Sequence, residues 1–246
     1  MKEHRAVSLF ILSSMAVVGI LLLILPHLNQ QMHGKAASVA QDSRPVVVLD
    51  AGHGGFDGGA QANNINEKEI NLALVLKEAR LCRLFGFEPV LTRSTDSSIH
   101  DEGSATVREK KRSDMRKRLA MMIADPQSVA VSIHLNKFPQ SAVHGAQVFY
   151  APRAVGSDLL AQTIQDSFKL LLQPENNREI KKADKDLFLL YNNESTPAVI
   201  VECGFISNPA EAAQLKSEQY QEQVAMTICY ALLKFQSRGE VTEYAP

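Results

Sequence analysis

The stretch Val46-Val47-Val48-Leu49-Asp50-Ala51-Gly52-His53-Gly54-Gly55 decides the fold. Its β-branched, apolar first half predicts a buried strand, and the glycines that follow leave one histidine at the carboxyl end of that strand. The same pattern occurs twice more, because the apolar run 129–133 leads into His134 and the run 198–201 leads into Glu202. Ligands bind at the carboxyl ends of strands in open α/β sheets, so these three strands predict one shared site.

Helical patterns lie between the expected strands. Asn66 is a good N-cap, Glu69 lies three residues later as in a capping box, and an apolar stretch covers residues 70–84 before Gly86. Further helices are expected at 113–124, at 156–172, from 209 onwards and at 224–235. Further strands are expected at 88–92, at 145–150 and at 187–191. Strands that alternate with helices predict a single-domain α/β fold with a mainly parallel sheet.

The composition fits one globular domain behind a short leader. The chain has 246 residues, of which 45% are hydrophobic and 22% are charged, and we expect one catalytic domain at 44–237 with a tail at 238–246. The formal net charge of −1 gives no reason to expect a nucleic-acid partner. Because the chain has no tryptophan, an aromatic platform for sugar stacking is not expected.

The three cysteines are best explained as structural residues. They form no CxxC pair, which argues against a cysteine-based zinc cluster, and their odd number argues against a disulfide framework. Cys82 and Cys229 lie in apolar helical stretches and are expected to be buried. Cys203 is a weak candidate nucleophile, because it follows Glu202 in a strand and should point to the opposite face.

The amino terminus predicts export of the domain. Residues 1–26 contain an uncharged apolar run about long enough to span a bilayer, so we interpret them as a signal peptide or a membrane anchor. Lys2 and Arg5 precede this run and favour a cytoplasmic amino terminus with an extracytoplasmic domain. The small residues 38–40 resemble a cleavage site, and residues 27–43 are expected to be a linker.

The histidines at the strand ends predict a catalytic zinc site. Of the seven histidines, His53, His100, His134 and His144 lie in the expected domain, and only His53 and His134 end apolar strands. Catalytic zinc in hydrolases commonly has three protein ligands, for example two histidines and one glutamate, with the fourth position open to water. The sequence lacks both the lysine of a phosphate-binding loop and an HExxH helix, so we expect neither a P-loop protein nor a thermolysin-like protease.

Two glutamates compete for the place of the third ligand. Glu67 and Glu69 both lie in the first turn of the helix at 66–84, where a carboxylate also complements the helix dipole. The spacing of Glu69 from Asn66 gives it a capping role, so Glu67 is preferred, although spacing alone does not decide between them. Glu202 extends a buried strand and is a candidate general base and acid beside a metal-activated water.

A basic helix follows the second expected strand. A solvent-exposed helix face is the default interpretation, and contact with an anionic polymer or with peptide carboxylates is the functional alternative. Its members, interleaved with Glu109 and Asp114, are Arg108, Lys110, Lys111, Arg112, Arg116, Lys117 and Arg118.

Four motifs follow one another along the domain. They are Asp50-Ala51-Gly52-His53-Gly54-Gly55-Phe56-Asp57-Gly58-Gly59-Ala60, Glu67-Lys68-Glu69, Ser132-Ile133-His134-Leu135-Asn136 and Glu202-Cys203-Gly204-Phe205-Ile206-Ser207-Asn208. In this order they resemble the motifs of the zinc-dependent N-acetylmuramoyl-L-alanine amidases (the amidase-3 family), and the similarity covers residues 46–235. A bare catalytic domain behind a leader, without a cell-wall-binding repeat domain, resembles the spore-cortex, germination-related branch of that family.

The resemblance implies roles for individual residues. It makes His53, Glu67 and His134 the Zn²⁺ ligands and Glu202 the catalytic glutamate, and it assigns substrate contacts to Arg116 and Asn136. The match at Arg116 needs a one-residue shift, and Met121 stands where the family often has asparagine. The implied fold is a twisted, mostly parallel sheet flanked by helices, with the zinc site at the strand ends.

The implied reaction is hydrolysis of the amide between N-acetylmuramic acid and the L-alanine of the peptidoglycan stem peptide, in spore cortex maturation. Two alternatives stay open: a zinc peptidase or deacetylase that acts on the same polymer, and a non-catalytic, membrane-tethered peptidoglycan-binding protein. The sequence does not reveal whether the leader is cleaved or whether a protein activator is needed.

Overall fold

A six-stranded sheet in the order β4-β1-β5-β8-β6-β7 forms the centre of the structure, a computed structural model that describes residues 44–243. The predicted leader at 1–26 and linker at 27–43 lie outside these residues. The strands of the sheet are β1 (Val46–Ala51), β4 (Glu88–Leu91), β5 (Val129–Asn136), β6 (Gln147–Tyr150), β7 (Lys181–Lys182) and β8 (Ala198–Phe205).

The sheet is mostly parallel, as predicted. Strands β4, β1, β5 and β8 run in the same direction, whereas β6 pairs with β8 in the antiparallel direction and β7 pairs in parallel with β6. A separate hairpin joins β2 (Gln61–Ala62) to β3 (Ile65–Asn66). Because β1, β5 and β8 are neighbours and parallel, their carboxyl ends lie at one edge of the sheet.

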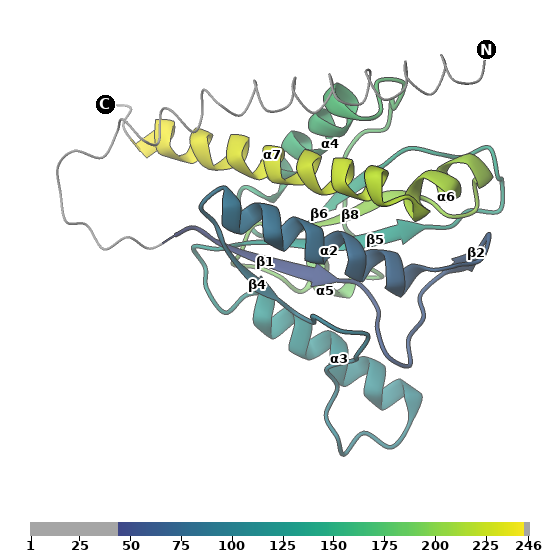
Figure 1. Ribbon diagram of the computed structural model, residues 1–246. Helices are drawn as coiled ribbons and strands as arrows, with labels where there is room; N and C mark the ends of the chain where they lie inside the picture. Colours follow the sequence, from purple (N-terminus) through teal and green to yellow (C-terminus); the bar gives the residue numbers. More distant parts are fainter. Residues whose placement is uncertain (1–43, 244–246) are drawn as a thin grey trace, which may run out of the picture. The chain divides into compact units, whose positions relative to one another are not determined.

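Helices cover both faces of the sheet (Figure 1). One layer contains α2, α4 and α7, and the other contains α3 and α5. The helices are α2 (Glu67–Leu84), α3 (Val107–Met122), α4 (Ser157–Leu171), α5 (Phe188–Tyr191), α6 (Pro209–Lys216) and α7 (Glu218–Glu243).

Side chains on the α3 and α5 side of the sheet form part of the hydrophobic core. Val48 of β1, Ala130 of β5 and Ile200 of β8 pack there with Met122 of α3 and Leu190 of α5. Side chains alternate between the two faces of a strand, so the residues two and four positions further along β5, and the residue two positions further along β8, lie on this same face. The strands therefore begin in the core and end at the candidate site.

One predicted strand is wrong. Residues 188–191 of this segment form the short helix α5, in which Leu189 and Leu190 are buried and the N–H of Tyr191 donates to the carbonyl of Leu187. A short apolar run does not by itself distinguish a strand from a buried helical turn, and here the buried pair packs beside α3 rather than in the sheet.

Several helix ends differ from the predicted ones. Helix α3 begins at Val107 rather than 113, because Thr106 and Glu109 form a capping box that the sequence interpretation overlooked. The capping box predicted at Asn66 is absent, because neither the Asn66 nor the Glu69 side chain binds a backbone N–H group there. The Asn66 side-chain amide donates instead to the Glu69 carboxylate at 2.9 Å. Helix α7 extends to Glu243, into the segment predicted as a tail.

The three cysteines are free and buried, as predicted. Cys203 has no exposed surface, which fits its expected position on the face of β8 opposite Glu202. Among residues 44–243, no helix is both long enough and apolar enough to cross a membrane.

A buried ion pair joins α3 to the end of β1. The Arg118 guanidinium donates to the Asp50 carboxylate at 2.6 Å, and the two side chains are 2% and 0% exposed. Thr92 and Ser132 donate hydroxyl hydrogen bonds to the same carboxylate, and Asp114 binds the other side of the guanidinium at 2.6 Å. Burial alone would raise the pKa of Asp50, but Arg118 and the two hydroxyl groups outweigh it and hold that pKa below its usual value.

We expect Arg118→Met to lower the free energy of unfolding by about 3–5 kcal/mol at neutral pH, because it leaves the Asp50 charge buried without its cation. The loss should shrink as the pH falls toward about 4, the unfolded pKa of an aspartate. In the variant, burial raises the pKa of Asp50 and proton uptake relieves the buried charge. In the parent protein, the lowered pKa means that stability is lost below that pH.

Urea unfolding from pH 4 to pH 7 measures this prediction. Arg112→Met, an exposed arginine on the same helix, is the matched control and should change stability by less than about 0.5 kcal/mol. An equal loss in both variants at all pH values would contradict the role given to the buried pair.

Candidate active site

Three potential metal ligands converge at the carboxyl edge of the sheet. His53 follows β1, His134 lies in β5 and Glu67 begins α2. The His53 Nε2 atom lies 3.2 Å from one Glu67 carboxylate oxygen, and the His134 Nδ1 atom lies 3.0 Å from the other. One ligand atom from each of the three residues lies within 4.8 Å of the others, so the group could hold a metal ion.

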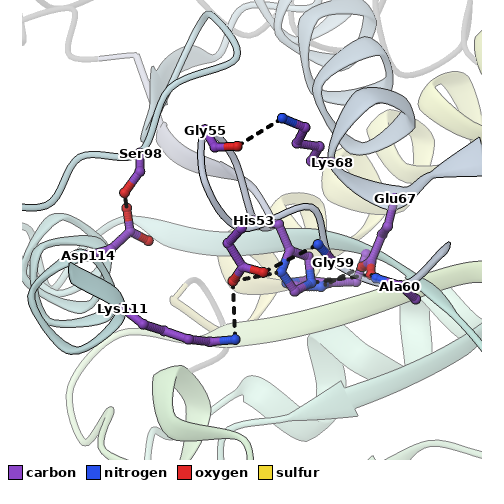
Figure 2. A network of polar contacts seen from close by, with 12 residues as sticks. His53, Gly55, Gly59, Ala60, Glu67, Lys68, Ser98, Lys111 and Asp114 are labelled. Atoms are coloured by element: carbon purple, nitrogen blue, oxygen red, sulfur yellow. Dashed lines mark hydrogen bonds and ion pairs between the residues drawn. The ribbon is translucent and has the colours of Figure 1, made fainter. Parts of the chain in front are cut away.

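The β2–β3 hairpin places Glu67 in this cluster. The Glu67 N–H donates to the carbonyl of Ala60, and the Glu67 carboxylate accepts a hydrogen bond from the Ala60 N–H at 2.7 Å (Figure 2). The same carboxylate accepts a second hydrogen bond from the Leu135 N–H at 3.1 Å. Glu69 instead lies at the surface with Asn66. The structure therefore brings Glu67, and not Glu69, to the two histidines.

Two glycines make room for the cluster. A Cβ atom at Gly59 would lie 2.6 Å from a Glu67 carboxylate oxygen and 2.7 Å from the His53 ring. A Cβ atom at Gly52 would lie 2.3 Å from the His134 ring. Since real Cβ contacts are not that short, the backbone reaches the ligand side chains only because both positions lack a side chain.

Asp57 and Lys111 fix the orientation of His53. The Asp57 carboxylate lies 3.1 Å from His53 Nδ1, which leaves Nε2 directed toward Glu67, and Lys111 of α3 lies 3.2 Å from the same carboxylate (Figure 2). A carboxylate on the second ring nitrogen is the usual support of a histidine metal ligand. Burial lowers the pKa of His53, but its hydrogen bonds to Asp57 and Glu67 outweigh burial and raise that pKa to about 9.

Two buried arginines hold the backbone of the glycine loop, residues 52–59. Arg93 is 3% exposed and donates to the carbonyls of Ala51, Gly52 and Lys68 at 2.8–3.1 Å. Arg118 donates to the carbonyl of His53 at 2.6 Å. His53 itself has a left-handed backbone with φ of 61°, which is uncommon for a residue other than glycine and is maintained here by these surrounding contacts.

Glu202 lies beside the ligand cluster on the neighbouring strand. It pairs with His134 in the parallel register of β5 and β8, so the two side chains lie on the same face of the sheet. One carboxylate oxygen of Glu202 is buried without a hydrogen-bond partner among the described residues. Burial raises the pKa of Glu202 to about 7, an effect that nearby His134 partly offsets. A carboxyl group with such a pKa can both accept and donate a proton near neutral pH.

The two residues assigned to substrate contacts lie in different surroundings. Asn136 follows His134 by two positions on the same face of β5, and its side-chain oxygen accepts the N–H of Lys137. Arg116 is exposed on α3 and has no ion-pair partner among the described residues. Most of the basic residues of α3 are exposed, as expected, but Arg118 and Asp114 of the same segment are buried.

The sequence interpretation did not identify Asp57, Arg93 or Arg118 as parts of the site. Asp57 lies four residues after His53, a spacing that could have indicated it within the glycine loop. Arg93 and Arg118 act through backbone carbonyls that carry no sequence signal of their own. The remaining two histidines of the domain stay outside the cluster: His100 binds Ser98 and His144 binds the carbonyl of Ala142.

Comparison with known proteins identifies the family of the chain. The family model of the N-acetylmuramoyl-L-alanine amidases (Amidase_3) matches residues 47–234. The chain belongs to this amidase family. It is an amide hydrolase that cleaves the bond between N-acetylmuramic acid and the L-alanine of the peptidoglycan stem peptide, and its substrate lies outside the cytoplasm, in the cell wall.

Individual amidases extend the comparison. The germination-specific N-acetylmuramoyl-L-alanine amidase of Bacillus subtilis is 32% identical over 202 residues, which are 82% of this chain and 84% of that protein. The solved structure of the CwlD amidase of Clostridioides difficile, in complex with the GerS lipoprotein, has 40% identity and a TM-score of 0.75 and covers 79% of this chain and 99% of that one. The amidase AmiA of Escherichia coli is 25% identical over 231 residues, with 82% of this chain and 80% of that protein covered.

We expect Asp57→Asn to weaken metal binding roughly 10- to 100-fold, because an amide supports the His53 ring less well than a carboxylate. Competition with a chromogenic chelator measures this affinity in the purified amidase. Asp101→Asn, which removes an exposed carboxylate paired with Lys117, is the control and should leave the affinity unchanged. Equal affinities in all three proteins would show that Asp57 does not support the site.

Proposed function

We propose that this amidase depends on zinc held by His53, Glu67 and His134, and that Glu202 transfers the protons of the reaction. The convergence of the three ligand groups beside a half-buried glutamate is the observation that carries the proposal. Two histidines and one carboxylate are a common zinc ligand set in hydrolases. The absence of a side chain at Gly59 supports the fit of a metal ion to this site, because a Cβ atom there would push apart the Glu67 carboxylate and the His53 ring.

Zinc held by these three residues would act as a Lewis acid that polarises the scissile carbonyl and lowers the pKa of the attacking water toward ~7. The protein supplies proton transfer and orientation. Glu202 accepts a proton from the attacking water and donates one to the departing amine of L-alanine. Its pKa of about 7 suits both directions of transfer. Asp57 keeps His53 in the required ring orientation through its hydrogen bond to Nδ1.

We expect Glu202→Gln to lower amidase activity roughly 10²–10⁴-fold while the protein keeps its fold and its zinc, because the amide can neither accept nor donate the transferred proton. Glu67→Gln should instead lose zinc together with activity. Mass spectrometry of digested peptidoglycan measures activity, and elemental analysis measures zinc. Glu69→Gln, an exposed neighbour of Glu67, is the matched control and should retain both.

The same digest separates the amidase from other wall hydrolases. An amidase releases stem peptides that begin with alanine and leaves glycan with bare lactyl groups. A peptidase would shorten the peptides, and a deacetylase would leave them attached. Full activity of Glu202→Gln, or activity that survives removal of zinc by a chelator, would refute the proposed roles.

We further propose that the amidase acts on the spore cortex after export through its amino-terminal segment. The germination-specific relative in Bacillus subtilis supports this setting. Spores that lack the protein should retain stem peptides on muramic acid residues that are bare in the parent strain, whereas the vegetative wall should not change. Muropeptide analysis of both walls measures this, and an altered vegetative wall with a normal cortex would contradict it.

We also propose that the amidase binds a lipoprotein partner like that of the Clostridioides difficile amidase, and co-elution of the two purified proteins tests it.

A further inference from the structure

We propose that Arg178 binds a carboxylate of the stem peptide, the free carboxylate of the residue that follows L-alanine, and so positions the substrate across the sheet. This inference rests on the proposed function, because it takes Glu202 and the ligand cluster as the place where the amide is cleaved. It adds a specificity-determining residue that lies outside the four family motifs.

Arg178 lies on the same face of the sheet as Glu202. Gln147 of β6 pairs directly with Glu202 of β8 in an antiparallel register, so their side chains point to one face with Cβ atoms roughly 4.5–5.5 Å apart. The Arg178 Nη1 atom donates to the side-chain oxygen of Gln147 at 3.3 Å. Arg178 therefore binds the side chain of the residue that pairs with Glu202 across the two strands.

A register shift brings a second support to this face. The pairing of β5 with β8 shifts between His134 and Asn136, so that Asn136 pairs with Phe205. Since His134 and Asn136 are two residues apart, they share a face, and Phe205 lies on that face with Glu202. The Arg178 guanidinium carbon lies 4.6 Å from the centre of the Phe205 ring. Ring and cation stack in a favourable cation–π contact.

The position of the guanidinium is fixed before substrate arrives. Besides its contacts with Gln147 and Phe205, its Nε atom donates to the carbonyl of His144 at 2.9 Å. The backbone N–H of Arg178 donates to the Asn176 side chain at 3.0 Å. A side chain held at this many points loses little conformational freedom when it binds a ligand.

Arg178 has no carboxylate partner among residues 44–238. The half-buried guanidinium takes part in no ion pair, and its Nη2 atom has no hydrogen-bond partner there. Glu211 is close enough to interact electrostatically with Arg178, but the two oxygens of its carboxylate accept hydrogen bonds from the N–H groups of Gly145 and Phe205. Arg93 and Arg118, in contrast, direct their donors to backbone carbonyls and to Asp50. Arg178 therefore has donors available for an incoming anion.

The order of the strands determines how far the Arg178 guanidinium lies from the ligand cluster. The ligand cluster lies on the β1 and β5 side, Glu202 lies on β8, and Gln147 with Arg178 lies on β6. Two strand spacings separate β5 from β6, which is about 10 Å. A stem peptide of about three extended residues spans that length, so the free carboxylate of its second residue lies within reach of the Arg178 guanidinium. Arginine binds such a carboxylate through two parallel hydrogen bonds.

The test compares two synthetic glycan fragments with stem tripeptides that differ only in the second residue, a free acid in one and its amide in the other. The parent amidase should cleave the acid with a kcat/KM roughly 10- to 100-fold above that for the amide. Arg178→Gln should abolish this preference through KM and leave the amide unaffected. Arg178→Lys should restore part of it, since lysine keeps the charge without the paired hydrogen bonds.

Arg153→Gln is the matched control, because Arg153 also stacks on an aromatic ring, that of Tyr191, but pairs with Glu194. It should keep the preference for the acid. A preference that survives in Arg178→Gln, or an equal loss on both substrates, would overturn the proposal.

Calorimetric titration with the released acid and amide peptides separates this proposal from the proposed function, because binding needs no turnover. If Arg178 is the contact, the acid peptide binds the parent protein more tightly than it binds Arg178→Gln, even where cleavage fails. Identical binding of acid and amide peptides by the parent protein would overturn the role of Arg178 while leaving the hydrolysis proposal intact.

Discussion

The buried guanidinium of Arg118 is the contact on which the site depends. It binds Asp50 at the end of β1, Asp114 one turn earlier on α3 and the carbonyl oxygens of Ala51 and His53. One side chain thus joins the sheet, a helix and the backbone of a proposed metal ligand. Burying an arginine is costly unless all its donors are satisfied, and here carboxylates and carbonyls share them. The hydrogen bond from Arg118 to the His53 carbonyl also holds the loop at a residue whose backbone is left-handed, which is uncommon for a residue other than glycine.

Close packing of backbone against side chain is the second requirement. Gly59 allows Glu67 and His53 to touch, and Gly52 lets the His134 ring lie against the end of β1. Once the three groups are in contact, the Glu67 carboxylate lies within hydrogen-bonding distance of both imidazole rings. Burial would raise the pKa of Glu67, but its hydrogen bonds to both histidines hold it well below the usual value, so the carboxylate stays ionised. The geometry that the glycines make possible therefore keeps this carboxylate in the form that binds a metal.

The sequence predicted the parts of the structure that depend on local pattern. The apolar runs that end in His53, His134 and Glu202 indicated β1, β5 and β8, because buried parallel strands have that composition. The helix at 188–191 was missed, since five apolar residues fit either state and tertiary packing beside α3 decided between them. Arg93 and Arg118 were missed for another reason. Their roles depend on hydrogen bonds between residues up to 68 positions apart, such as Arg118 with Asp50, and a local pattern contains no information about such contacts.

Strand register links the core to the chemistry. Along β8, Ala198 and Ile200 lie on the face that packs toward α3 and α5, and Glu202 is the next residue on that face. A slip of one residue would bring Cys203 to the site and move Ile200 from the α3 and α5 side to the opposite face, so packing of the apolar residues selects the register that presents the carboxylate. The antiparallel pairing of β6 extends the same logic, because it fixes Gln147 opposite Glu202 and with it the place of Arg178. Burial of a few aliphatic side chains therefore determines which polar groups meet at the edge of the sheet.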